Sequence, residues 1–167
     1  RFSIVVSSIY DHWAYSPRRW RFFGPIVTGL RWTYQTKRIP KSMQEVTYDF
    51  SNRIAVVTGG ANGIGSQIAS QYLDAGAKVV IWDLHPPKNK RKNAIFKEVD
   101  VSDLSQVENA TKDTINNWGK IDFLSHNAGY AGPTENTINY DTEAWIKTVQ
   151  VNLIGTYIVA KTVAPCM

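Results

Sequence analysis

Residues 54–65 read IAVVTGGANGIG, an apolar run followed by a glycine-rich turn and the start of an amphipathic segment. This order predicts a strand, a tight turn and then a helix. Glycines tolerate positive φ and let a ligand approach the backbone, and the first turn of a helix presents free N–H groups to an anion. The stretch therefore predicts a phosphate-binding turn. The alternative is a strand-to-helix turn that binds nothing.

The spacing of the glycines narrows the kind of turn. Gly59, Gly63 and Gly65 form the pattern G-x-x-x-G-x-G, which differs from G-x-x-x-x-G-K-[ST] and from G-x-G-x-x-G. No lysine follows Gly65. The pattern thus argues against a nucleoside triphosphatase of the P-loop type.

Length and composition fit one globular domain, because 167 residues with 43% hydrophobic and 20% charged side chains can form a core. Cys166 is the single cysteine, which excludes an internal disulfide and a cysteine-based metal cluster and favours a reducing, cytoplasmic compartment. The histidines, at positions 12, 85 and 126, have no metal-ligand spacing. We expect no metal.

The net charge of +5 is concentrated at one end of the chain. Residues 1–42 carry eight basic side chains against Asp11 alone, a net charge of +7, which leaves −2 for the rest. Since the region of the glycine turn is mildly acidic, the charge gives no support for nucleic acid as its partner.

Residues 1–42 form a basic, aromatic, irregular extension with four interpretations. It could be an organelle-targeting peptide, an interfacial membrane anchor or a nucleic-acid arm. Its longest apolar run, 22–30, is interrupted by Gly and Pro and is too short to cross a bilayer. We favour the fourth interpretation, in which the native chain begins at Met43 and the upstream residues are an unrelated extension.

From residue 43 onward, strand and helix patterns alternate. Strands are expected at 53–58, 78–82, 95–99 and 121–126, and helices at 63–75, 103–118 and 141–163. This alternation predicts an α/β fold, a Rossmann-type doubly wound parallel sheet over residues 43–167 that is truncated after the helix following the fourth strand. The basic stretch 86–92 reads as a solvated loop. The strand that begins at Ile121 should have an unpaired edge.

An acidic residue stands where the second strand should end. Asp83 follows the apolar run 79–82, eighteen residues beyond Gly65. In a dinucleotide fold a carboxylate there binds the adenosine ribose and repels a 2′-phosphate, which favours NAD over NADP. Nearby cations at positions 88, 90, 91 and 92 could neutralise a phosphate instead, and Asp83 could simply cap a turn.

Two further signals follow the third and fourth strands. Asp100 and Val101 pair a carboxylate with an apolar side chain, as an adenine edge and face would require. Asn127-Ala128-Gly129 places an amide and a glycine at the carboxyl end of a strand, where a cofactor ring can lie close.

These motifs, with Val151-Asn152-Leu153, together resemble the short-chain dehydrogenase/reductase family over about residues 50–167. The resemblance implies the role of each position. Gly59, Asn62, Gly63, Ile64 and Gly65 would surround the pyrophosphate of NAD(P), Asp83 would hold the adenosine ribose, Asp100 and Val101 would contact adenine, and Asn127 and Gly129 would lie by the nicotinamide-side ribose. Asn152 would belong to the catalytic set, break its helix locally and help hold a water in the proton relay.

His126 departs from the family's commonest pattern, which has another Asn before Asn127. A lone histidine beside a glycine turn is more often a structural hydrogen-bonding group than a catalyst. We interpret His126 as structural.

The proton donor that hydride transfer to a carbonyl requires is not evident. The family pairs a Tyr and a Lys at i and i+4 with a Ser. Tyr157 and Lys161 have that spacing but stand five residues after Asn152, in the helix that precedes the family's catalytic one. We therefore expect Tyr157 to be a core aromatic and Lys161 to lie on the helix flank.

Two functional hypotheses follow. The first is an NAD-dependent oxidoreductase acting on a secondary alcohol or ketone, present here as a fragment that lacks the Ser and the Tyr-x-x-x-Lys and is active only with the remainder, the full-length protein being a homo-oligomer. The alternative is a truncated, non-catalytic nucleotide-binding module. A third hypothesis makes the extension a nucleic-acid or membrane arm.

Overall fold

The structure is a computed structural model that describes residues 47–167. The predictions for residues 1–42 and for a native start at Met43 lie outside the described residues. The elements, in chain order, are β1 (Ile54–Thr58), α1 (Gly63–Asp74), β2 (Lys78–Asp83), β3 (Ala94–Glu98), α2 (Leu104–Trp118), β4 (Phe123–His126), α3 (Thr142–Val149), a π-helical turn (Gln150–Ile154), α4 (Gly155–Val163) and a 3₁₀ turn (Ala164–Cys166).

The strands form one parallel sheet in the order β3-β2-β1-β4. The chain moves outward from β1 to β3 and then crosses to the other side of β1 to form β4. This reversal makes the β1–β4 boundary the topological switch point, where open α/β sheets bind ligands beyond the carboxyl ends of their strands.

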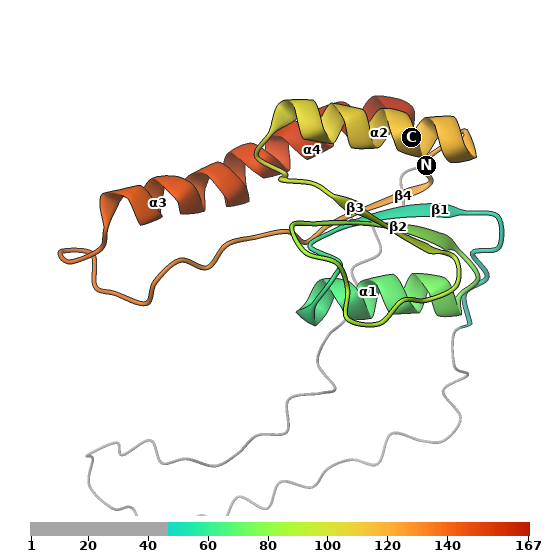
Figure 1. The fold of residues 1–167 in the computed structure, drawn as a ribbon, viewed down its shortest axis with the longest axis horizontal. Coiled ribbons are helices and arrows are strands. Elements are labelled where there is room, and N and C mark those ends of the chain that lie inside the picture. The colour runs from blue at the N-terminus through green and yellow to red at the C-terminus, as the bar shows by residue number, and fades with distance from the viewer. Residues whose placement is uncertain (1–46) are drawn as a thin grey trace, which may run out of the picture. The chain divides into compact units, whose positions relative to one another are not determined.

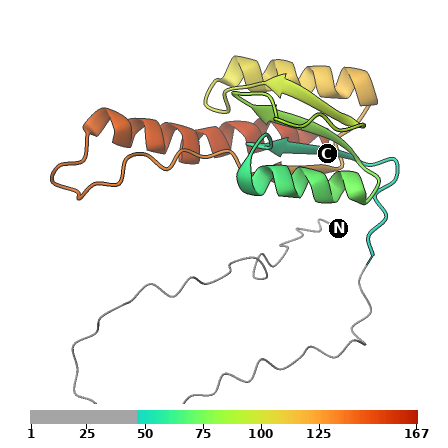
Figure 2. The ribbon, with the colours of Figure 1, turned by 60° about the horizontal axis from the view of Figure 1, so that its bottom comes forward.

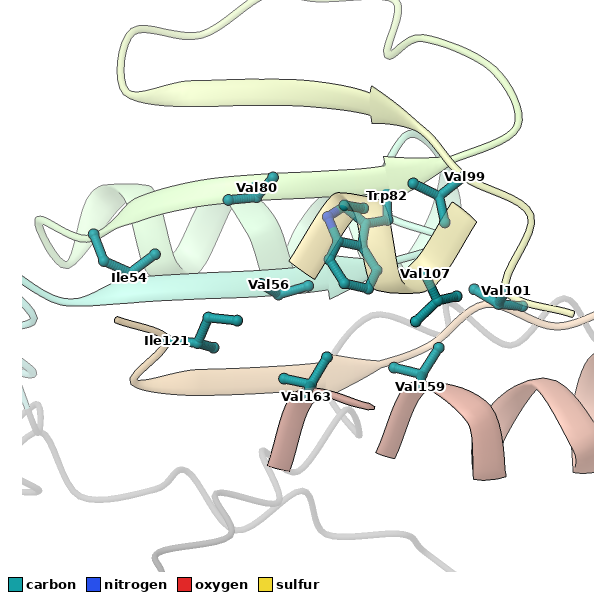
Figure 3. Close-up of a cluster of buried hydrophobic side chains, with 11 residues drawn as sticks. Ile54, Val56, Val80, Trp82, Val99, Val101, Val107, Ile121, Val159 and Val163 are labelled. Atoms are coloured by element: carbon teal, nitrogen blue, oxygen red, sulfur yellow. The ribbon is translucent and has the colours of Figure 1, made fainter. Parts of the chain in front are cut away.

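Helices cover both faces of the sheet. Figure 1 shows α1 on one face and α2 with α4 on the other. β1 is buried throughout and apolar from Ile54 to Val57, as expected for a strand covered on both sides. Ile54 and Val56 face α2 and α4, and Ala55 and Val57 face α1, so two apolar clusters form. Trp82 lies among the valines of the larger cluster (Figure 3).

The predicted Rossmann-type sheet is confirmed, with strand boundaries displaced by up to two residues. The prediction of a single helix over 141–163 is wrong, because the π turn divides this segment into α3 and α4. The turn contains Asn152, which confirms the expected local break. Figures 1 and 2 show α3 extending away from the sheet while α4 lies against it.

The β2–β3 connection contains no helix, in contrast to the connections made by α1 and α2. Residues 84–93 form a loop, as predicted for the basic stretch, and Arg91 bonds Asp74 at the end of α1 at 2.6 Å. A hollow of about 740 Å³ on the α1 face of the sheet is lined by this loop, by α1 and by residues 60–63 of the glycine turn.

Candidate functional site

The site begins at the carboxyl ends of β1 and β4, which the parallel register brings together. Thr58 ends β1 and is fully buried, and its hydroxyl accepts the N–H groups of Asn127 and Ala128 at 3.0 Å each. The Asn127 side chain donates to the Gly59 carbonyl at 3.2 Å. The glycine turn is thereby tied to the loop after β4.

Close packing explains two of the three motif glycines. A Cβ on Gly59 would stand 2.8 Å from the Ala128 Cα, and one on Gly65 would overlap the Gly59 carbonyl oxygen and stand 2.6 Å from the side-chain Nδ2 of Asn127. Both approaches are far below van der Waals contact. These two glycines therefore allow the turn, α1 and the Asn127 loop to meet.

Gly63 is different, because a Cβ there would meet no atom within 4 Å. Its φ is +54°, in the region that favours glycine. Asn62 is the N-cap of α1 but makes no side-chain capping bond, and the first turn of α1 has no acidic residue. Ile64 is 56% exposed. The first turn of this helix thus has no acidic side chain of its own and borders open space at Gly63, as a phosphate cradle requires.

Asp83 ends β2 on the opposite side of the turn. One carboxylate oxygen accepts the Ala61 N–H at 3.0 Å and the other accepts the His85 N–H at 3.3 Å. Each oxygen can accept a further hydrogen bond. The carboxylate is therefore oriented by the turn and still able to bind a diol.

Asp100 and Val101 follow β3 at the same edge of the sheet. One Asp100 oxygen accepts the backbone N–H and the hydroxyl of Ser102, at 2.9 and 2.7 Å. Val101 is only 5% exposed, and its side chain belongs to the core cluster that includes Val107 and Val159. The side chain of Val101 is thus occupied in packing.

Asn152 lies in the π turn and clamps the loop after β4. Its Oδ1 accepts the Tyr130 N–H at 2.8 Å, and its Nδ2 donates to the Tyr130 carbonyl at 3.0 Å. A Cβ on Gly129 would stand 3.3 Å from the Asn152 Oδ1. Asn152 is thus in contact with Gly129 and Tyr130 of the loop after β4.

His126 ends β4 and lies between two threonines. Its Nδ1 is 3.1 Å from the Thr58 hydroxyl, and its Nε2 is 3.0 Å from the Thr156 hydroxyl. Burial lowers the pKa of His126 below its ordinary value of 6.5. The neutral ring is therefore the favoured form at neutral pH.

Tyr157 and Lys161 are both exposed on α4, and the ammonium lies 5.6 Å from the centre of the phenol ring. The prediction of a core aromatic is wrong, since Tyr157 is 62% exposed. The reason is helical geometry. The residues of α4 that face the sheet recur at intervals of four: Gly155, Val159 and Val163. Tyr157 therefore lies on the opposite side of the helix, which no part of residues 47–167 covers.

Sequence reasoning missed the roles of Thr58, Tyr130 and Thr156. The signal for Thr58 was present, since a hydroxyl at the end of an otherwise apolar strand needs a buried partner. Tyr130 and Thr156 act through contacts with residues 22 and 30 positions away. No local pattern encodes those contacts.

Residues 47–167 contain no group of three or more His, Cys, Asp and Glu side chains arranged to hold a metal ion. None of their helices has the length and apolar character needed to cross a bilayer.

The doubly wound sheet, with a glycine turn and an open helix N-terminus at its switch point, defines a dinucleotide-binding class of α/β protein. Residues 53–167 match the family model described as short chain dehydrogenase. The chain belongs to the short-chain dehydrogenase family of oxidoreductases.

Named relatives agree with that membership. Short-chain dehydrogenase reductase 4 of Arabidopsis thaliana is 34% identical over 131 residues, covering 74% of this chain and 44% of the relative. 2-Dehydro-3-deoxy-L-rhamnonate dehydrogenase (NAD(+)) of Sphingomonas sp. (strain SKA58) is 32% identical over 123 residues, covering 71% and 49%. The chain spans about half the length of the curated relatives it matches.

A solved structure shows the same fold. The ligand-free aldohexose dehydrogenase of Thermoplasma acidophilum superimposes with a TM-score of 0.66 at 29% identity, covering 72% of this chain and 45% of that one.

Proposed function

We propose that this chain is the cofactor-binding part of an oxidoreductase that transfers hydride between NAD(H) and a secondary alcohol or ketone. One observation carries the proposal. At the switch point of the sheet, the uncapped N-terminus of α1 and the open Gly63 face outward, and Asn127 ties this turn to the end of β4. Membership of the family supports the reaction class.

The residues fit a dinucleotide laid along the carboxyl edge of the sheet. The N–H groups at the start of α1 would bind the pyrophosphate and Asp83 the adenosine ribose. Asp100 and the backbone of Val101 would face adenine, and Asn127 and Gly129 would lie by the second ribose. The nicotinamide would supply the hydride acceptor or donor, and the fixed turn would orient it.

NAD is favoured over NADP by the charge at the ribose. Asp83 is anchored by two N–H groups, so it cannot swing away from a 2′-phosphate without losing both. Arg91 of the adjacent basic loop is paired with Asp74 on α1. Lys88, Lys90 and Lys92 of the same loop could also meet a phosphate, but Asp83 stands closer to the strand end, so we take its negative charge as the better guide to the cofactor.

Asn152 is the chain's contribution to the family's catalytic set. Its side chain accepts the Tyr130 N–H and donates to the Tyr130 carbonyl, which fixes the backbone beside the proposed nicotinamide position. Hydride transfer is proposed for a protein that carries this chain together with the family's Ser and Tyr-x-x-x-Lys. We also propose a cytoplasmic location and self-association, the latter supported by the exposed apolar side chains along α3, the π turn and α4, which include Ile146, Leu153 and Tyr157.

The test is cofactor selectivity, measured by fluorescence titration of the purified chain with NADH and NADPH. We expect NADH to bind about tenfold more tightly, since a unit charge facing a phosphate at close range costs about 1–2 kcal/mol. Asp83→Asn keeps the oxygen that accepts from Ala61 and removes the charge, so the preference should shrink. Asp113→Asn, on the exposed face of α2, is the control and should change nothing. Equal or tighter NADPH binding by the unaltered chain would contradict the proposal.

A further inference from the structure

Thr58 determines the proton positions at one side of His126. Its hydroxyl oxygen already accepts two backbone N–H groups, from Asn127 and Ala128. A hydroxyl has two acceptor positions and one proton. Both acceptor positions are filled, so the proton of the Thr58 hydroxyl is the group that contacts His126, and the Nδ1 atom accepts it at 3.1 Å.

Thr156 determines the proton positions at the other side. Its hydroxyl donates its only proton to the Asn152 carbonyl oxygen at 2.6 Å, because a carbonyl can only accept. The oxygen of Thr156 must then accept from His126, so the Nε2 atom carries the proton in the 3.0 Å contact. The two threonines therefore require the same tautomer independently.

The result is one directional chain of hydrogen bonds. It runs from the N–H groups at the end of β4 through Thr58, His126 and Thr156 to the backbone carbonyl of Asn152. The opposite tautomer would present a third donor to Thr58, which has no free acceptor position. Both threonine partners are uncharged.

We propose that His126, held as the neutral Nε2–H tautomer, is a positioning residue that fixes the Asn152 turn against the carboxyl end of the sheet. The His126 side chain takes the place of backbone hydrogen bonds between the Asn152 turn and β4. Asn152 lies in a helical turn, and among residues 47–167 β4 has no strand neighbour on the side away from β1. The significance of this position for nicotinamide rests on the proposed function. The hydrogen-bond chain itself does not.

The first test is the tautomer, read from long-range ¹⁵N–¹H correlations of the histidine rings in the full chain without cofactor. We expect the His126 signals, assigned by their loss in His126→Gln, to show a single Nε2–H form at pH 7. An Nδ1–H form, a charged ring or an even mixture of tautomers would overturn the proposal.

The second test is rescue at Thr156, which is exposed, so its variants should fold. Thr156→Val removes the hydroxyl at constant shape and should shift the amide resonances of Asn152 and Tyr130. Thr156→Ser restores the hydroxyl and should return them to their original positions. Thr114→Val removes the same kind of i−4 bond on α2 and should leave them unmoved. Unchanged resonances in Thr156→Val, or equal shifts in the Val and Ser variants, would overturn the proposal.

Because both tests use the chain without cofactor, their outcome is separate from that of the NADH titration. Failure to bind NADH would contradict the proposed function alone. A wrong tautomer would contradict the role of His126 alone.

Discussion

Gly63 and Gly119 have the same backbone requirement but different surroundings. Each has a positive φ, +54° and +79°, and a Cβ on either would meet nothing within 4 Å. Gly63 lies in the proposed cradle, whereas Gly119 is the C-cap of α2. Alanine substitutions at the two positions therefore separate the effect of backbone strain, which both share, from the effect of lost ligand space, which only Gly63 can show.

We predict that Gly63→Ala and Gly119→Ala each lower the free energy of unfolding by about 1 kcal/mol, the cost of a left-handed conformation for alanine. Only Gly63→Ala should weaken NADH binding, because its methyl group would occupy the space left for the pyrophosphate. Urea unfolding and NADH titration measure the two effects. Equal NADH affinity in both variants would argue against the cradle.

At the scale of single residues, the sequence identified the motif positions but not their connections. Gly59 and Gly65 were predicted as ligand contacts, and the structure adds a packing reason for each, against Ala128 and Asn127. Val101 remains predicted to contact adenine, and since its side chain packs in the core, that contact would come from its backbone. Local pattern shows which residue type stands at a strand end and does not show which way that side chain turns.

Asp122 connects two elements, since it holds the starts of β1 and β4 together. Its carboxylate accepts the Ile54 N–H at 2.9 Å and pairs with Arg53 and Lys120 at 2.8 and 2.9 Å. Burial alone would raise the pKa of Asp122, but the bonds from Lys120, Arg53 and Ile54 outweigh it and the pKa is lowered from 3.8. The charged form therefore stabilises the fold.

We predict that Asp122→Ala lowers the free energy of unfolding at pH 7 by about 1–3 kcal/mol, because it leaves the buried Ile54 N–H without an acceptor. Asp122→Asn keeps an acceptor oxygen and should cost less. Since the folded pKa is lowered, the stabilisation is present above pH 3.8 and is lost as the pH falls through the folded pKa. Urea unfolding at several pH values measures this. If the free energy of unfolding of the Asp122→Asn variant fell at low pH as much as that of the unaltered chain, the loss could not be assigned to protonation of Asp122.

At the scale of elements, the order of strands and helices was predictable because short continuous apolar runs alternate with longer amphipathic segments. The π turn was predictable only through the family resemblance of residues 151–153. The exposure of Tyr157 could not be predicted, because contacts with Val101 and with Val107 of α2 determine which face of α4 packs on the sheet. These contacts join residues more than fifty positions apart.

For the whole molecule, the sheet order explains why distant motifs form one site. The switch point lies where β1 and β4 meet, so the turn after β1 and the loop after β4 become neighbours although about seventy residues separate them. Asp83 and Asp100 follow β2 and β3 along the same edge. One extended ligand that follows this edge would contact all of these positions.

The most direct measurement is the map of ¹H–¹⁵N amide resonances of the purified chain as NADH is added. We predict shifts confined to residues 59–65, Asp83, 100–101 and 127–130, and none at Lys97 and Asp113, which pair on the outside of β3 and α2. Saturable shifts that cluster at residues 86–91 and spare the glycine turn, or an unchanged spectrum at saturating NADH, would contradict this prediction.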